Sequence, residues 1–103
     1  IKSLIEAGAD LNIQDKGGKT ALMLAVEVRK AEYIQLLIDA GADVNLQAKN
    51  GRTALMKAIE QNRKIAIVLL IEAKADLNAQ DEDGQTALML AINWNNNEAI
   101  QLL

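Results

Sequence analysis

The strongest constraint on this chain is an eight-residue segment that recurs three times at a constant interval. The segment reads GKTALMLA from Gly18, GRTALMKA from Gly51 and GQTALMLA from Gly84, so successive copies lie 33 residues apart. A fixed period of about 20 to 50 residues is typical of stacked structural repeats. The chain is therefore predicted to be a single array of roughly three repeats, and not an ordinary globular domain.

The register of the repeat also divides the chain. Residues 1–15 form a partial repeat, residues 16–48 and 49–81 form full repeats, and residues 82–103 form a second partial repeat. Residues 1–7 match residues 34–40 and 67–73 in the same register, so we expect the chain to open partway through a helix. Because both ends fall inside a repeat, we expect an excerpt of a longer array whose ends expose apolar stacking surface. This predicts end-to-end stacking between molecules.

Each copy carries the signals of two helices. In each copy a threonine (Thr20, Thr53 or Thr86) stands two residues after the glycine that opens the repeated segment. This threonine can cap the start of a first helix. Apolar residues then recur at helical spacing, and a second apolar stripe follows a polar break. Such short helices are marginal in isolation, so each pair must bury its faces against its neighbours. The sequence predicts an all-α repeat of helix, turn, helix and long loop.

Composition narrows the possible partners and locations. Half of the residues are apolar but only 2% are aromatic, so the core must be aliphatic. The net charge of −3 argues against a nucleic-acid partner, which needs a basic surface. No apolar run approaches the roughly 18 residues of a membrane span, so no membrane partner is expected. The absence of cysteine removes disulfides and thiolate zinc sites, and we expect a cytoplasmic location.

The segments Gly-x-Thr-Ala-Leu-Met-x-Ala and Gly-Ala-Asp-Val-Asn, at this period and in this order, resemble ankyrin repeats. The resemblance covers the whole chain. It implies an all-α solenoid of stacked helix-turn-helix units, whose loops project as hairpin-like fingers at an angle to the helices. It also implies a concave face that is formed by the fingertips and the first helices.

Several residues depart from the family pattern. Alanine follows each capping threonine, where the family usually has proline, and methionine stands two residues further on, where histidine is frequent. The methionines, Met23, Met56 and Met89, are expected to pack in the core and not to bind a metal. Arg29 and Lys74 replace glycine at turns where a left-handed backbone is expected, which costs a non-glycine residue on the order of 1 kcal/mol.

Short motifs that suggest chemistry are better explained by the repeat register. Gly18-Lys19-Thr20 resembles the end of a P-loop, but Ile13 stands where that loop needs its first glycine. The acidic run before Gly84 is only a fragment of a calcium-binding loop. The chain has no histidine or cysteine and only one serine, so a nucleophile with an imidazole base cannot be assembled. We expect neither an enzyme nor a cofactor or metal site.

Positions that differ between the copies are the candidates for recognition of a partner. Lysines and an arginine stand at the predicted tips of the first two full copies, whereas the third tip is acidic, so a charge gradient is expected. Trp94 either offers an exposed hot spot for binding or packs on the next repeat. The candidate partner-binding residues are Lys16, Lys19, Val28, Lys49, Arg52, Lys57, Gln61, Glu82, Asp83, Gln85 and Trp94.

Three functions remain open from the sequence. The first is a non-catalytic protein-protein interaction module that binds a protein partner through its concave face. The second is a regulatory segment of a larger enzyme or effector. The third is a sensor of a small ligand or nucleotide that uses Lys19, Arg52 and Trp94.

Overall fold

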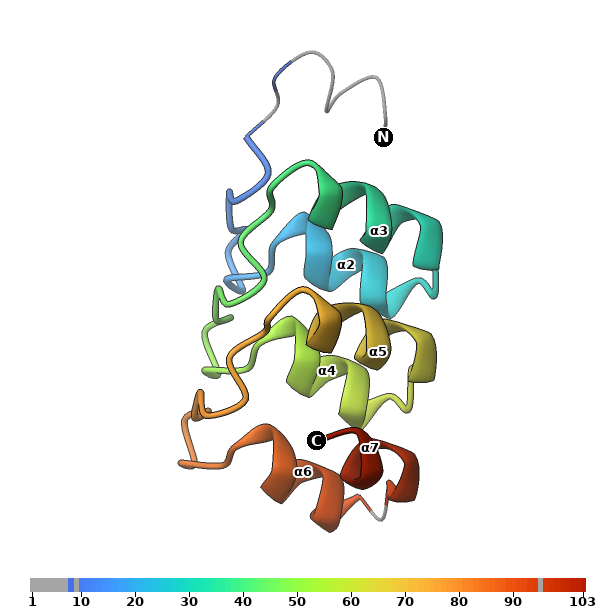
Figure 1. Ribbon diagram of the computed structural model, residues 1–103. Coiled ribbons are helices and arrows are strands. Elements are labelled where there is room, and N and C mark those ends of the chain that lie inside the picture. The colour runs from blue at the N-terminus through green and yellow to red at the C-terminus, as the bar shows by residue number, and fades with distance from the viewer. Residues whose placement is uncertain (1–7, 9, 95) are drawn as a thin grey trace.

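The computed structural model shows a stack of helix pairs (Figure 1). It describes residues 8, 10–94 and 96–103, and within these residues it contains helices and no strand. The helices are α2 (Ala21–Glu27), α3 (Ala31–Asp39), α4 (Ala54–Glu60), α5 (Lys64–Glu72), α6 (Ala87–Asn93) and α7 (Asn97–Leu102). The predicted all-α repeat fold is confirmed. The expected helix at the start of the chain lies outside the described residues.

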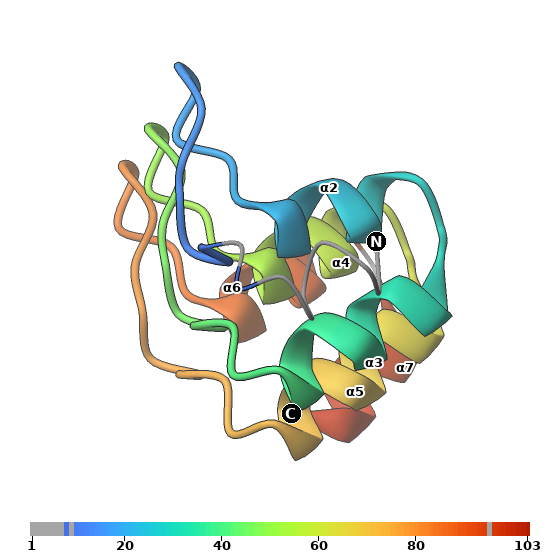
Figure 2. The same ribbon diagram turned by 90° about the horizontal axis from the view of Figure 1, so that it is seen from above.

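The helices form two layers that run along the stack. The first helices of the pairs, α2, α4 and α6, lie in one row, and the second helices, α3, α5 and α7, lie in a parallel row beside it (Figures 1 and 2). The connecting loops project side by side at an angle to both rows, which gives the section an L shape (Figure 2). The inside of this L is the concave face, bordered by the loops and by the first helices.

Each first helix begins at a threonine cap, as the sequence predicts. The hydroxyl oxygens of Thr20 and Thr53 accept hydrogen bonds from the backbone N–H groups three residues later, at 3.3 Å in both cases. Thr86 makes the same bond at 3.4 Å. These bonds satisfy N–H groups that have no partner within the helix, so the threonines fix where the first helices start.

Left-handed backbone occurs at the turns where it is expected. Arg29 and Asn62, which join the helices of the first two described pairs, have φ values of 59° and 56°. Lys74 has a φ of 67° at the end of α5, where the preceding copy carries Gly41 with a φ of 94°. Asparagine and glycine tolerate this conformation, but lysine and arginine do so only at a cost in free energy.

The core is aliphatic and lies between successive pairs. Met23 and Met56 are buried, as predicted for core methionines. Met89 occupies the same position in α6 but is 48% exposed, so the prediction is wrong for this residue. The reason is stacking: α4 covers α2 and α6 covers α4, whereas no described helix packs on the far side of α6. None of the described helices is long and apolar enough to cross a membrane.

Candidate functional site

The fingers are closed by tight turns whose glycines also let neighbouring fingers approach. In the first finger the N–H of Asp15 donates to the carbonyl of Lys19, and the N–H of Gly18 donates to the carbonyl of Asp15, both at 2.9 Å. A Cβ atom on Gly18 would lie 2.7 Å from the backbone nitrogen of Lys49 in the next finger. Glycine is therefore needed there for close approach as well as for its φ of 79°.

Hydrogen bonds link each finger to the next. The N–H of Lys49 donates to the carbonyl of Gly17 at 3.0 Å, which joins two fingers through their backbones. The Gln47 amide donates to the carbonyls of Gly51 at 2.7 Å and Gln80 at 2.9 Å, and so spans its own finger and the following one. The fingers thus form a connected row, and little conformational entropy remains to be lost when a partner binds.

Hydrogen bonds also link the base of each finger to the base of the next. The carboxylate of Asp43 accepts the N–H of Asn45 at 2.9 Å, which closes a local turn. The amide oxygen of Asn45 then accepts the N–H of Asp76 in the following repeat at 2.7 Å. These aspartate and asparagine residues therefore shape the loops, as expected from their common position in the repeats.

Lys19 and Lys57, two of the candidate residues, share one carboxylate. The Oε1 atom of Glu27 lies 2.9 Å from the Lys19 ammonium in its own repeat and 2.8 Å from the Lys57 ammonium in the next. The hydrogen bonds from Lys57 and then from Lys19 hold the pKa of Glu27 below its ordinary value. The hydrogen bond to Glu27 raises the pKa of Lys19. Both lysines are therefore partly neutralised on the concave face.

Arg52 is held by two carboxylates. It forms an ion pair with Glu60 of its own first helix, and its Nε atom lies 3.6 Å from Oδ2 of Asp81 in the next finger. The Asp81 side chain is almost fully buried, and its other oxygen accepts the N–H groups of Asp83 and Gln85, both at 2.9 Å. Arg52 thus joins two neighbouring fingers.

Sequence reasoning missed Glu27 and Asp81 as partners of these cations. A signal for Glu27 was present in the repeats. Lys19 and Arg52 occupy the same position in successive repeats, between the glycine and the capping threonine. Each of these basic residues is followed eight positions later by a glutamate, Glu27 or Glu60. In the third copy, where the finger residue is Gln85, the matching residue is an uncharged asparagine. No comparable signal pointed to Asp81.

The fingertips carry the charges that stay open to solvent. Lys16 and Lys49 are exposed on the first two tips, and Glu82 and Asp83 are exposed on the third. Within the described residues none of these four takes part in an ion pair. The sign of the exposed charge therefore changes along the row of fingers. Gln85 lies lower on the third finger and is only partly exposed.

The remaining candidates lie at the other end of the first helices. Val28, Gln61 and Trp94 are the C-cap residues that directly follow α2, α4 and α6. Val28 is 58% exposed and Trp94 is 55% exposed, whereas the side-chain oxygen of Gln61 is buried and has no hydrogen-bond partner among the described residues. Both interpretations of Trp94 stay open, because no described helix stacks on the far side of α6.

The structure does not bring together the three residues of the ligand-sensor hypothesis. Trp94 borders a pocket of about 300 Å³ with Ile59, Glu60 and residues that precede and begin α7. Lys19 and Arg52 are not among its lining residues. No group of three or more acidic residues in the described part of the chain is placed to hold a metal ion.

Stacked helix pairs with a row of linked fingers define a repeat solenoid that carries a preformed concave face. The family model for ankyrin repeats, in three copies, matches residues 1–81 and 40–103, which together span the whole chain. The chain belongs to the ankyrin-repeat family. Among curated proteins, no relative matches it. Ankyrin repeats generally act in protein-protein interaction.

Proposed function

We propose that this chain is a non-catalytic module that binds a protein partner through its concave face. The observation that carries the proposal is the row of fingers, which hydrogen bonds hold in place while the charged tips stay exposed. A rigid surface of this kind avoids the entropic cost of ordering loops on binding. The absence of cysteine is compatible with action in the cytoplasm, which we retain as part of the proposal.

The exposed charges of the fingertips suggest which charge pattern the partner carries. The lysines on the first two tips and the carboxylates on the third favour a partner whose own charge changes sign along the contact. The ion pairs of Glu27 and Arg52 keep the floor of the face near neutral, so the tips would dominate the approach of the partner. In this proposal the charged tips steer the partner as it approaches, and the exposed surface of the first helices makes the close contacts.

The test is a pull-down that compares matched charge reversals. Lys16→Glu combined with Lys49→Glu reverses the exposed tip charges without breaking an ion pair of the described structure. Lys30→Glu combined with Lys74→Glu makes the same change in charge outside the fingertips and first helices. We expect specific partners to be captured by the parent and the control and lost from the tip variant. Equal capture by all three chains would refute binding through the tips.

We also propose that molecules of this chain stack through the outer face of α6. Leu88 and Ile92 are exposed there, whereas Leu55 and Ile59, which occupy the same positions in α4, are buried under α6. A second copy can cover this face with the helices that begin its own stack. Sedimentation should then show association that increases with concentration and is abolished by Leu88→Glu. A parent chain that stays monomeric at high concentration would contradict stacking.

A further inference from the structure

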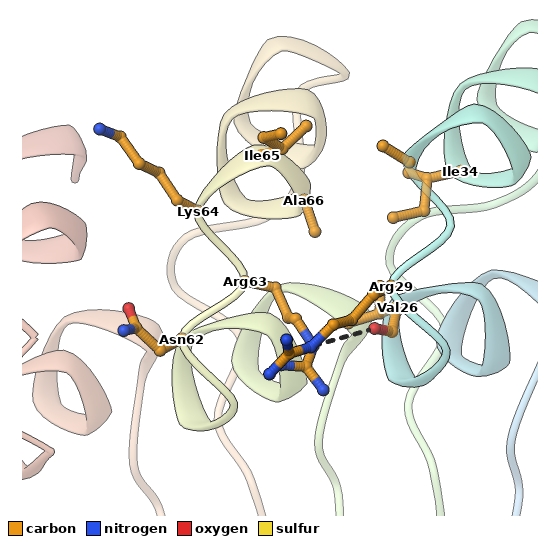
Figure 3. A pocket seen from close by; sticks show the side chains of 9 residues that line it. Val26, Arg29, Ile34, Asn62, Arg63, Lys64, Ile65 and Ala66 are labelled. Carbon is orange, nitrogen blue, oxygen red and sulfur yellow. Dashed lines mark hydrogen bonds between the residues drawn. The ribbon is translucent and has the colours of Figure 1, made fainter.

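A second candidate site lies away from the fingers, at the edge formed by the turns within the helix pairs. Here a pocket of about 310 Å³ opens between the turn from α2 to α3 and the turn from α4 to α5 (Figure 3). Val26, Ile34 and Ala66 form its apolar wall, and Ile65, which is 63% exposed, extends that wall to the surface. Figure 3 shows Ile34 and Ala66 on opposite sides of this space. The pocket has room for an aliphatic side chain.

The guanidinium of Arg63 lies at one side of this pocket. Its Nε donates to the carbonyl of Val26 at 3.4 Å, and its Nη atoms donate to the carbonyls of Gln61 at 3.2 Å and Glu27 at 3.5 Å. These contacts fix the side chain but leave its charge unneutralised, because no carboxylate in the described residues forms an ion pair with it. Burial, followed by the nearby charge of Arg29, lowers the pKa of Arg63.

Arg29 brings a second guanidinium to the same side of the pocket (Figure 3). Its side chain forms neither an ion pair nor a hydrogen bond with any of the described residues. Its backbone is left-handed, with a φ of 59°, which arginine adopts only at a cost. Two like charges and a strained backbone are thus maintained at one place, a combination that points to a functional role.

The start of α5 adds to the positive potential. Arg63 precedes this nine-residue helix and offers no side-chain acceptor for its first N–H groups. The equivalent residue before α7 is Asn96, whose side-chain oxygen accepts the N–H of Ala99 at 3.0 Å. The first turn of α5 lines the pocket, so its N–H groups and the positive end of its dipole lie beside the two guanidinium groups.

The same place in the next repeat has a different lining, although the backbone is alike. The pocket beside Trp94 lies one repeat further along and has a similar volume, about 300 Å³. The positions of Arg29, Arg63 and Lys64 are taken there by Asn62, Asn96 and Asn97. Ile65 is replaced by Glu98. The basic and apolar character is therefore a property of the first pocket, and the second serves as its natural control.

We propose that the basic pocket, defined by Val26, Arg29, Ile34, Arg63, Ile65 and Ala66, binds an acidic peptide segment of a partner protein. An aliphatic side chain of the segment would occupy the apolar wall, and an adjacent carboxylate would meet Arg29 and the free donors of Arg63. A guanidinium matches the planar carboxylate with paired hydrogen bonds. The apolar wall and the negative charge of the whole chain disfavour a nucleic acid as occupant.

The probe is a synthetic peptide with the central sequence Glu-Leu-Glu, titrated into the isotope-labelled chain and followed by NMR. Two control peptides carry Gln-Leu-Gln, which lacks the charge, and Glu-Ala-Glu, which lacks the aliphatic side chain. We expect saturable shifts of the backbone signals of Ile65 and Ala66 and of the Arg29 side chain. Both control peptides should bind at least about tenfold more weakly.

Two variants test the pocket itself. Arg29→Asn with Arg63→Asn and Lys64→Asn gives it the residues that the chain already carries at the same positions one repeat later. Ile65→Glu copies Glu98 and changes an exposed residue, so it keeps the test valid if the triple variant fails to fold. Each variant should weaken binding of the Glu-Leu-Glu peptide at least about tenfold. Unchanged affinity, no saturable shift, or shifts confined to the fingers would overturn the proposal.

Because the basic pocket lies on another edge of the molecule, its test is independent of the concave face. The double Lys16→Glu and Lys49→Glu variant should bind the Glu-Leu-Glu peptide as the parent does, apart from a general effect of charge. A loss of peptide binding in this variant equal to that in Ile65→Glu would place the peptide on the fingers and reject the pocket.

Discussion

The carboxylate of Glu27 on α2 lies 2.8 Å from the ammonium of Lys57 on α4, so one ion pair bridges two successive repeats. Stability in a repeat array is approximately the sum of contributions from each repeat and from the interfaces between neighbours. This pair belongs to an interface. Both side chains are partly buried, so their interaction is screened by solvent but keeps a fixed geometry.

A double-mutant cycle should measure this interfacial contribution. We expect a coupling of about 0.2 to 1 kcal/mol between Glu27→Gln and Lys57→Met, because partly exposed ion pairs stabilise proteins only weakly. Urea denaturation of the four chains gives the coupling, which should decrease in high salt. The control cycle combines Lys64→Met with Glu98→Gln, whose ion pair is more exposed and longer, at 3.7 Å. Equal coupling energies in the two cycles would contradict the view that the Glu27–Lys57 pair stabilises the interface between repeats more than an exposed pair does.

Glu27 should also make the stability of the array depend on pH in the acid range. Hydrogen bonds from Lys57 and Lys19 lower its pKa in the folded state. Such a carboxyl contributes stability that is fully present above its unfolded pKa, about 4.3, and is lost as pH falls through the lower folded pKa. The free energy of unfolding should therefore fall less between about pH 5 and 3 in Glu27→Gln than in the parent. Parallel pH profiles of the two chains would refute this linkage.

Lys74→Gly should stabilise the chain. The left-handed φ of 67° strains lysine, and glycine adopts it freely, so we expect a gain of about 0.5 to 1 kcal/mol in the free energy of unfolding. The reciprocal change, Gly41→Lys, is a matched control at the same position of the preceding repeat. A Cβ atom there would meet no atom of the described residues within 4 Å, so any loss of stability reports on the backbone alone. A denaturation midpoint that Lys74→Gly leaves unchanged or lowers would disprove the effect.

The position of a leucine in the stack should decide how far its replacement by alanine lowers the free energy of unfolding. Leu55 and Leu88 occupy the same position in α4 and α6, but Leu55 is 1% exposed and Leu88 is 45% exposed. Leu55→Ala should cost about 2 to 5 kcal/mol because it leaves a cavity between repeats. At concentrations low enough to keep the chain monomeric, Leu88→Ala should cost less than about 1 kcal/mol. Similar losses in calorimetry would show that the outer face of α6 is covered in solution.

Much of the fold could be predicted from the sequence because each repeat restates the same local signals. Thr20 and Thr53 cap helices, and Arg29 and Lys74 take up left-handed backbone, as their positions indicate. Met89 was misplaced because a repeat pattern specifies which face is apolar, but not whether a neighbour covers that face.

The candidate sites were less predictable, for a related reason. Variation between copies identified the exposed tips, but it could not show that Asp81 reaches across to Arg52, because such pairing depends on how closely the fingers approach. The basic pocket combines residues of two repeats, Arg29 and Arg63, that share no local pattern. Their proximity follows only from the stacking of one turn on the next.

Arg29→Asn should raise stability and weaken peptide binding at the same time. Asn62 holds the equivalent turn with nearly the same φ, 56° against 59°, and asparagine tolerates this conformation better than arginine does. We expect the free energy of unfolding to rise by about 0.5 kcal/mol, partly because the repulsion between Arg29 and Arg63 also disappears. Urea denaturation measures the first effect and the NMR titration with the Glu-Leu-Glu peptide measures the second. If the arginine serves only the fold, the substitution will instead lower the midpoint and leave the peptide affinity unchanged.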